Sequence, residues 1–161
     1  MSRPNRTSPE HPGTALERVE LRKAACGEIF ALRHNVLTVG TGRKSSDYPG
    51  DTDPSTHHFG AFLDGRNIGC ATFLRSEWNH LPAWQLRGMA VEFVFRSSGL
   101  GGKLLDFAED FIRRDSEIHQ LWCNARIKAV NFYLRHGWQT ESEPFDIPGV
   151  GPHVKMSKSL T

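Results

Sequence analysis

The chain has 161 residues, of which 38% are hydrophobic and 24% charged, a composition typical of one globular domain. Its 20 Lys and Arg stand against 18 Asp and Glu, so the formal charge is only +2 and no basic stripe forms. This balance disfavours a nucleic-acid-binding protein, which normally clusters its basic residues. No apolar run reaches the length of about 18 residues that a membrane span needs. We therefore expect neither nucleic acid nor membrane among the partners.

The first 14 residues are rich in proline and lack the apolar segment of a signal peptide. They are predicted to be a disordered leader, with one domain over residues 15–161. The three cysteines, Cys26, Cys70 and Cys123, are odd in number and contain no C-x-x-C pair. Free thiols in a reducing compartment fit this pattern, so we expect a cytoplasmic protein.

The first half of the domain alternates between strand and helix patterns. Residues 16–21 alternate apolar and charged side chains and predict an edge strand. Residues 25–37 carry an apolar stripe with helical spacing. Residues 38–56 contain three glycines and two prolines and predict a long loop, which in a compact domain often serves as a lid or binding loop.

Three strands are predicted next. The first two, at residues 57–63 and 67–75, are joined through Asp64-Gly65, the turn chemistry of a tight hairpin. A third strand is predicted from about Pro82 to Phe95. A glycine at position 88 inside this strand indicates a β-bulge or a close approach of another group to the backbone.

The second half begins with a glycine cluster that opens the strongest helical pattern of the chain, ending near residue 115. A short strand at 119–123 and a helix at 127–136 follow, and Gly137 caps that helix. Two last strands are expected at 138–141 and 153–157. The resulting order, β–α–ββ–β–α–β–α–ββ, predicts one α+β domain.

Arg96-Ser97-Ser98-Gly99-Leu100-Gly101-Gly102 lies between a predicted strand and a predicted helix. Such a junction presents unpaired backbone N–H groups at the positive end of a helix dipole, which suits a pyrophosphate. The segment fits neither the P-loop pattern nor G-x-G-x-x-G, but it matches [RQ]-x-x-G-x-[GA]. A purely structural strand-to-helix turn is the alternative.

With these motifs the chain resembles the GNAT superfamily of acyl-CoA-dependent N-acyltransferases. The resemblance is carried by residues 86–91, 96–101, 122–126 and 129–138, the last of which matches A-x-x-F-Y-x-x-x-G-[FW]. It implies the α/β/α sandwich-like GNAT fold, in which a mixed, mostly antiparallel sheet is flanked by helices. It also implies acetyl transfer from acetyl-CoA to a primary amine of a small molecule or peptide, by direct attack in a ternary complex. Family members often dimerise, so a homodimer is one expectation.

The family's motifs assign roles to individual residues. Tyr133 would contact the thioester sulfur, and strand N–H groups would stabilise the carbonyl oxygen. The residues expected to bind acetyl-CoA are Met89, Ala90, Val91, Arg96, Ser97, Ser98, Gly99, Leu100, Gly101, Gly102 and Asn131. Met89, Val91 and Tyr133 also fit plain core positions, which is the structural alternative.

The general base is the least defined part of the site. Some family members have a glutamate four residues before the Met-Ala-Val position, where this chain has Gln85. His153 is the first candidate, because histidine titrates near neutral pH. Glu92, or His34 beside Arg33 on the first helix, and a water-mediated path with no single base remain alternatives.

Other chemistries are less well supported by the sequence. The remaining histidines lack metal-ligand spacing, so we expect no metal, and Cys123 on a buried strand favours packing over nucleophilic catalysis. Asp47, Asp51 and Asp53 in the long loop could meet a cationic amine or could simply be solvated. The missing glutamate also leaves a second function open, a non-catalytic sensor or interaction module that binds acyl-CoA.

Overall fold

The computed structural model describes residues 15–161, and the expected leader at residues 1–14 lies outside the described residues. In the first half the elements are η1 (Leu16–Arg18), β1 (Val19–Ala24), α2 (Cys26–Arg33), η2 (His34–Thr38), β2 (His57–Leu63), β3 (Arg66–Trp78) and β4 (Leu81–Val91). In the second half they are η3 (Phe93–Phe95), α3 (Leu100–Asp115), β5 (Gln120–Arg126), η4 (Ile127–Ala129), α4 (Val130–Arg135), β6 (Gln139–Thr140), β7 (Phe145–Ile147) and β8 (Gly151–Ser159). In this part of the chain no helix is both long and apolar enough to cross a membrane.

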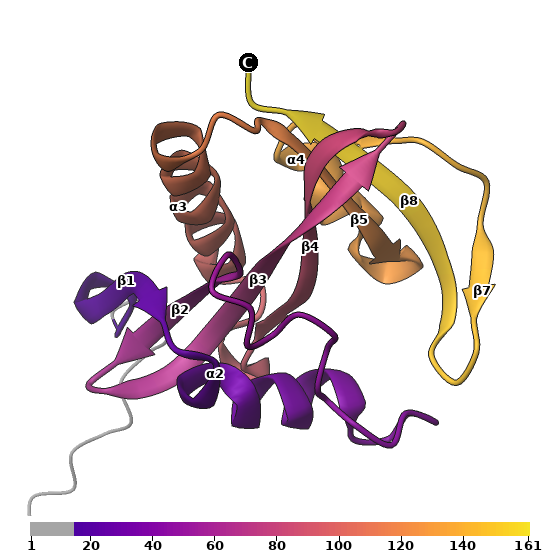
Figure 1. Cartoon of the computed structure of the whole chain (residues 1–161). Helices are drawn as coiled ribbons and strands as arrows, with labels where there is room; N and C mark the ends of the chain where they lie inside the picture. The colour runs from indigo at the N-terminus through magenta and orange to yellow at the C-terminus, as the bar shows by residue number, and fades with distance from the viewer. Residues whose placement is uncertain (1–14) are drawn as a thin grey trace, which may run out of the picture.

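The strands form one mixed sheet in the order β1-β2-β3-β4-β5-β8-β6, with β7 also paired to β8 (Figure 1). All neighbouring strands are antiparallel except β4 and β5, which are parallel. This confirms the predicted mixed, mostly antiparallel sheet. The single parallel pair lies in the middle, so the sheet consists of two antiparallel halves joined there.

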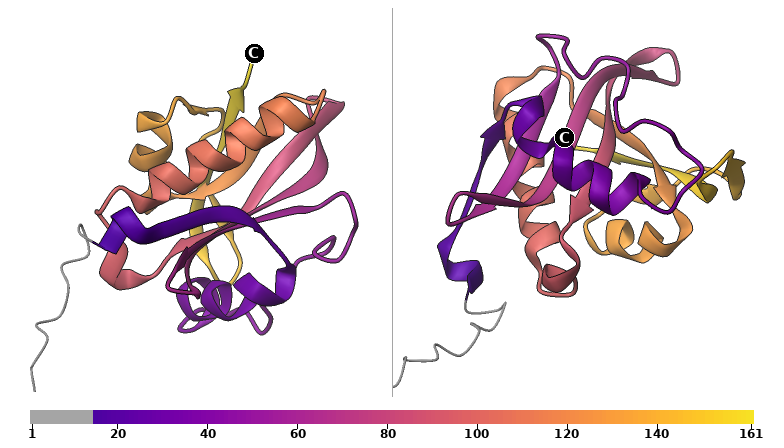
Figure 2. Two further views of the ribbon diagram at one scale, coloured as in Figure 1. Left: turned by 90° about the vertical axis from the view of Figure 1, so that its left-hand side faces the viewer. Right: turned by 90° about the horizontal axis from the view of Figure 1, so that it is seen from below.

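Helices cover both faces of the sheet. Figure 2 shows α3 and α4 on one side and α2 on the other, as the α/β/α description requires. The main core fills the α3 side, where Trp84 and Leu86 of β4 pack with Leu104, Leu105 and Ile112 of α3. The α2 side has a smaller core built on Ile29.

A buried ion pair fixes α3 against the end of the sheet. Glu109 of α3 is only 2% exposed, and its carboxylate lies 2.5 Å from Lys158 Nζ of β8. Burial raises the pKa of Glu109, against the opposing effect of Lys158. The same ammonium group donates a hydrogen bond to the His136 carbonyl at 2.7 Å, so α3, β8 and the end of α4 are held together.

The glycine in β4 behaves as predicted. Cys70 pairs with Ala90 and Thr72 with Arg87, so one residue of β3 faces two of β4, a β-bulge at Gly88. The φ angle of Gly88 is +66°, and a Cβ there would lie 2.9 Å from Arg33 Nε. Both the conformation and the contact therefore require glycine.

The hairpin turn is also confirmed, since Asp64 and Gly65 both have positive φ angles, 49° and 81°. Some boundaries were wrong. The third strand ends at Val91, because the Glu92 N–H donates to Ile68 and the next residues form the turn η3. The first strand starts at Val19, three residues later than expected. Strand β7 was missed because it has only three residues between two prolines.

Candidate active site

A cleft opens where β4 and β5 separate. The two strands pair only at three positions, Trp84–Leu86 against Leu121–Cys123, and both continue beyond the last pair. The β5-facing backbone of residues 87–91 therefore has no strand partner within the described chain. A cavity of about 1090 Å³ occupies this region, lined by the diverging strands and by parts of α3, α4, loop 38–56 and the β7–β8 hairpin. An extended ligand could pair with the free edge of β4 there.

The N-terminus of α3 faces the same cavity. Gly99 is its N-cap, with a left-handed φ of 89°. Two amides of the loop are occupied internally, because the Ser98 N–H donates to Phe95 O and the Leu100 N–H to Ser98 Oγ, each at 3.3 Å. Four amides have no acceptor within residues 15–161 and belong to cavity-lining residues: Ser97, Gly99, Gly101 and Gly102. These donors fit the phosphate oxygens of an acyl-CoA.

Close packing shapes this end of the cavity. A Cβ on Gly102 would lie 2.5 Å from the His136 ring, so a side chain there would displace the imidazole. The His136 ring packs against Phe132 in a tilted arrangement, with ring centroids 4.8 Å apart. Arg96 and Lys103 add positive charge at this end of the cavity. The glycine thus allows α3 and α4 to approach across the expected phosphate-binding end.

Tyr133 of α4 lines the cavity from the α3 side of the sheet. It is 6% exposed, and its ring packs between Phe132 and Trp138, at 5.1 and 5.3 Å between centroids. Burial raises the pKa of Tyr133 well above its usual value, with a smaller contribution from Cys123. The phenol therefore keeps its proton at neutral pH and can act only as a hydrogen-bond donor or acceptor.

His153 at the start of β8 lines the opposite side of the cavity and is 4% exposed. Its Nδ1 lies 2.7 Å from the Gly151 carbonyl oxygen, which can only accept a hydrogen bond. Nδ1 must therefore carry a hydrogen, and in the neutral ring Nε2 has the free lone pair. This is the tautomer that a proton acceptor needs.

The other candidate bases are placed differently. Glu92 does not line the cavity and is bound by Arg66 at 2.7 Å. His34 Nδ1 is bonded to Ser46 Oγ at 2.7 Å, and the ring lies outside the cavity lining. Gln85 does line the cavity. Of these candidates, Gln85 and His153 line the cavity, and of these two only the His153 imidazole can take up a proton.

Arg33 has a structural role. It is fully buried and binds Asp51 through both terminal nitrogens, at 2.6 and 3.1 Å. It also donates to Ser46 O at 3.2 Å and Thr72 Oγ1 at 2.7 Å, and so attaches loop 38–56 to β3. Asp51 is consumed in this pair, and neither Asp47 nor Asp53 lines the cavity. The idea that these loop aspartates meet a cationic amine is therefore wrong.

The long loop and the β7–β8 hairpin meet at the cavity. The Gly42 N–H donates to the Gly149 carbonyl at 2.8 Å. A Cβ on Gly42 would lie 3.0 Å from Gly149 Cα, so two glycines touch backbone to backbone. Arg43 and Tyr48 of the loop and Ile147 of the hairpin then line the α2 side of the cavity. The loop thus forms one wall of the cavity, and its role in binding stays a prediction.

One group elsewhere has the composition of a metal site. The possible ligand atoms of Cys26, Asp51 and His58 lie within 4.8 Å of one another. The nitrogen and oxygen atoms of this group already have hydrogen-bond partners. His58 Nε2 is bonded to the Asp51 backbone carbonyl and Nδ1 to Thr72 Oγ1, both at 2.8 Å, and Arg33 binds both oxygens of the Asp51 carboxylate. Burial also raises the pKa of the Cys26 thiol, which opposes thiolate ligation. These donors do not fit a metal ion.

Cys123 is buried, as the sequence suggested, and burial raises the pKa of its thiol to about 12. Such a thiol carries too little thiolate to serve as a nucleophile.

The cavity gathers most of the residues proposed from the sequence. Those that line it are Met89, Ala90, Val91, Arg96, Ser97, Gly99, Gly101, Gly102, Tyr133 and His153. Ser98, Leu100 and Asn131 do not line it; Leu100 is buried beneath the loop and Asn131 is exposed on α4. Sequence reasoning missed Tyr48, Arg87, Arg126 and His136. Strand alternation could have found Arg87, which shares a face of β4 with Gln85.

Comparison with known proteins explains this arrangement. The family model described as an acetyltransferase (GNAT) domain matches residues 54–140. The N-acetyltransferase YitI of Bacillus subtilis is 32% identical over 145 residues, covering 88% of this chain and 97% of that protein. The chain belongs to the GNAT superfamily. Like its relatives, it is an acyltransferase of the N-acetyltransferase type that uses acyl-CoA.

Solved structures of the superfamily share the fold. Escherichia coli ElaA superposes with a TM-score of 0.73 at 18% identity, covering 88% of this chain and 99% of the other. An acyl-CoA N-acyltransferase from Pseudomonas aeruginosa superposes with a TM-score of 0.70 at 19% identity and the same coverage. The predicted GNAT fold, a mixed and mostly antiparallel sheet flanked by helices, is therefore confirmed.

Proposed function

We propose that this protein transfers an acetyl group from acetyl-CoA to a primary amine of a small molecule or peptide, by direct attack in a ternary complex. One observation carries the proposal: free amides of the α3 N-terminus, the open edge of β4, Tyr133 and His153 all face one cavity. In this assignment the four free loop amides and Arg96 bind the pyrophosphate. The backbone of Met89 to Val91 binds the pantetheine arm.

The proton on the amine sets the first chemical requirement. An alkylammonium with a pKa of about 10.4 must lose a proton before it attacks, which costs about 4–5 kcal/mol at pH 7. We assign the acceptor role to His153 Nε2, the lone-pair nitrogen left by the Nδ1 hydrogen bond to Gly151. The attack then forms the C–N bond, and free N–H groups of β4 stabilise the carbonyl oxygen.

The leaving group sets the second requirement. As the C–S bond breaks, the sulfur becomes a thiolate with a pKa of about 8.5, lower than that of a phenol at about 10. Burial raises the pKa of Tyr133 further, so transfer of its proton to sulfur is uphill. Tyr133 therefore stabilises the thiolate by hydrogen bonding, and the thiolate takes its proton from water on release.

We also propose a cytoplasmic location. The three cysteines, all within the described residues, are free thiols. Two of them, Cys70 and Cys123, are buried in the core, where they act as small apolar side chains.

The proposal is tested by thiol release from acetyl-CoA with a panel of primary amines, beside a thermal shift measured with acetyl-CoA alone. Amine-dependent CoA release together with a higher melting temperature supports it. A shift without turnover on any amine would favour the acyl-CoA sensor. If acetyl-CoA causes no thermal shift and no amine gives turnover, the assignment of acetyl-CoA as co-substrate is overturned.

A further inference from the structure

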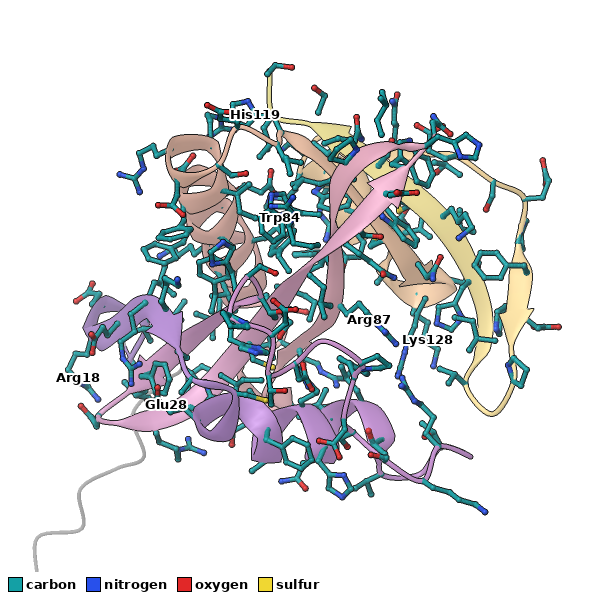
Figure 3. The ribbon with its side chains drawn as sticks, in the orientation of Figure 1. Arg18, Glu28, Trp84, Arg87, His119 and Lys128 are labelled. Atoms are coloured by element: carbon teal, nitrogen blue, oxygen red, sulfur yellow. The ribbon has the colours of Figure 1, made fainter. Side chains whose placement is uncertain are left out.

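The side of the cavity that faces α2 carries an unusual group of arginines around Tyr48. Thr72 pairs with Arg87, and Arg33 of α2 binds Thr72, so Arg87 projects on the α2 face of the sheet. The guanidinium of Arg87 lies 4.3 Å from the Tyr48 ring centroid, and that of Arg43 lies 5.1 Å from it. Arg87 and Arg43 both line the cavity, and Figure 3 marks Arg87 on β4. We call Arg43, Tyr48 and Arg87 the arginine–tyrosine cluster.

The two guanidinium groups of this cluster lack a carboxylate partner among residues 15–161. The carboxylate in the same region, Asp51, is bound on both oxygens by Arg33. Burial lowers the pKa of Arg87, and the charges of Arg43 and Arg33 lower it as well, against the opposing effects of Tyr48 and Asp51. The fold therefore holds two like charges close together, and the nearby carboxylate, Asp51, is already bound on both oxygens by Arg33, so a ligand with negative charge is favoured here.

The rest of the cavity does not supply that charge. Its lining includes seven Arg or Lys side chains and one carboxylate, that of Asp106 on α3. Asp106 lies on the other face of the sheet, 3.6 Å from His136 Nδ1. Arg126, also on the α2 side, donates to the Leu37 carbonyl and adds a third positive charge there. A simple alkylammonium would be repelled by this environment.

We propose that the natural acceptor is an amine that also carries a carboxylate, which binds between the Arg87 and Arg43 guanidinium groups. The planar guanidinium fork matches a carboxylate in geometry as well as in charge. The reacting nitrogen lies away from the carboxylate, toward the thioester end of β4. Positive charge around it favours the neutral amine, the form that attacks. This inference rests on the proposed acetyl transfer and narrows its substrate to amino acids and related acids.

The reaction stays balanced for such a substrate. The amine nitrogen forms a C–N bond to the acetyl carbon while the C–S bond of acetyl-CoA breaks. The amine loses one proton and the thiolate gains one, so the products are an N-acetyl amino acid and free CoA. The carboxylate takes no part in the chemistry; it only positions the amine.

The test compares acids with matched neutral amines. CoA release is measured for the L-amino acids that have a primary α-amine and for their α-carboxamides, which keep the side chain and lack the negative charge of the carboxylate. We expect kcat/KM for the best acid to exceed that of its carboxamide by about 10- to 100-fold, the size of a charge-assisted hydrogen bond. Aminoalkyl phosphates form a third arm, which separates carboxylate from phosphate recognition.

Variants locate the selectivity. R87Q and R43Q are expected to reduce the acid-to-amide ratio about tenfold or more, mainly through KM, whereas R87K restores part of it. R75Q is the matched control, because Arg75 is an exposed arginine of β3 that lies over Trp84 and outside the cavity lining. Melting temperatures and acetyl-CoA thermal shifts of each variant show that folding and cofactor binding persist.

The outcomes separate the two proposals. Absence of turnover with every amine overturns the acetyl-transfer proposal itself. Turnover that is equal for acids and carboxamides, better for carboxamides, or best for phosphates refutes the carboxylate site while acetyl transfer stands. An acid preference that R87Q and R43Q leave unchanged also refutes it, because other residues would then bind the substrate carboxylate.

Discussion

Replacing Arg33 with methionine tests what attaches the binding loop to the sheet. The arginine is fully buried, and its loss removes two hydrogen bonds to Asp51, one to Ser46 and one to Thr72. Methionine fills much of the space but leaves the Asp51 carboxylate buried without its cation. Breaking a buried ion pair from one side costs about 3–5 kcal/mol. The loop should detach from β3 more easily, and the whole protein should become less stable.

Urea unfolding followed by tryptophan fluorescence measures this loss. At a slope of about 2 kcal/mol/M, the midpoint of R33M should fall by about 1.5–2.5 M. The double variant R33M/D51N has no unpaired buried charge. Its loss in free energy of unfolding should therefore be smaller than the sum of the losses in R33M and D51N, by about 0.5–3 kcal/mol. A midpoint for R33M close to that of the wild type, or strict additivity, would refute the pairing argument.

Acid titration gives an independent check on the same pair. Burial by itself would raise the pKa of Asp51, but the hydrogen bonds from Arg33 and Tyr48 bring it below the usual 3.8. A lowered folded-state pKa means that the pair stabilises the protein above pH 3.8 and that this contribution is lost as the pH falls through the folded pKa. In R33M burial dominates, so the gap in stability between wild type and variant should narrow on acidification. A constant gap would contradict the assignment.

Three further outcomes are expected from the site and the core. Tyr133→Phe should lower kcat about 10²-fold and leave the acetyl-CoA thermal shift unchanged, and an unchanged kcat would reject the role of the hydroxyl. Gly102→Val, whose Cβ would lie 2.5 Å from the His136 ring, should raise KM for acetyl-CoA about tenfold or more in initial-rate assays. Burial raises the pKa of Cys70 and Cys123 to about 12, so only a fraction of about 10⁻⁴ of each thiol is ionised to the reactive thiolate at pH 8. Mass spectrometry after iodoacetamide should show both unmodified in the folded protein and alkylated in urea, and labelling of the folded core would contradict the burial.

Local rules were enough for most of the fold. Apolar periodicity located the helices and strands, and the Asp64-Gly65 turn and the Gly88 bulge followed from backbone conformations that few residues adopt. The failures lie where a long-range contact decides the conformation. Ile68 accepts a bond from the residue after β4 and ends that strand, and β7 exists only because β8 pairs with it.

The end of the cavity proposed to bind phosphate could be located from sequence because it is built from consecutive residues and a helix terminus. The proposed acceptor side could not, since it joins an arginine and a tyrosine of loop 38–56 to an arginine of β4. The role of Arg33 was also hidden, because its partner Asp51 is 18 residues away and the loop between them carries no regular pattern. Only the folded chain shows that Asp51 points inward and that, among residues 15–161, Arg43 and Arg87 contact Tyr48 but form no ion pair with a carboxylate.

In the described chain, the two antiparallel halves of the sheet are joined only through the three residue pairs between β4 and β5, which form a short junction or seam, and each half can be regarded as a plate. The pair farthest from the cleft, Trp84 with Leu121, lies outside the cavity lining, and the Trp84 indole is bonded to Ser116 at the end of α3 at 3.2 Å. A small rotation at such a seam is amplified with distance along the plates. The width of the cleft beside Val91 therefore depends partly on side chains that lie outside its lining.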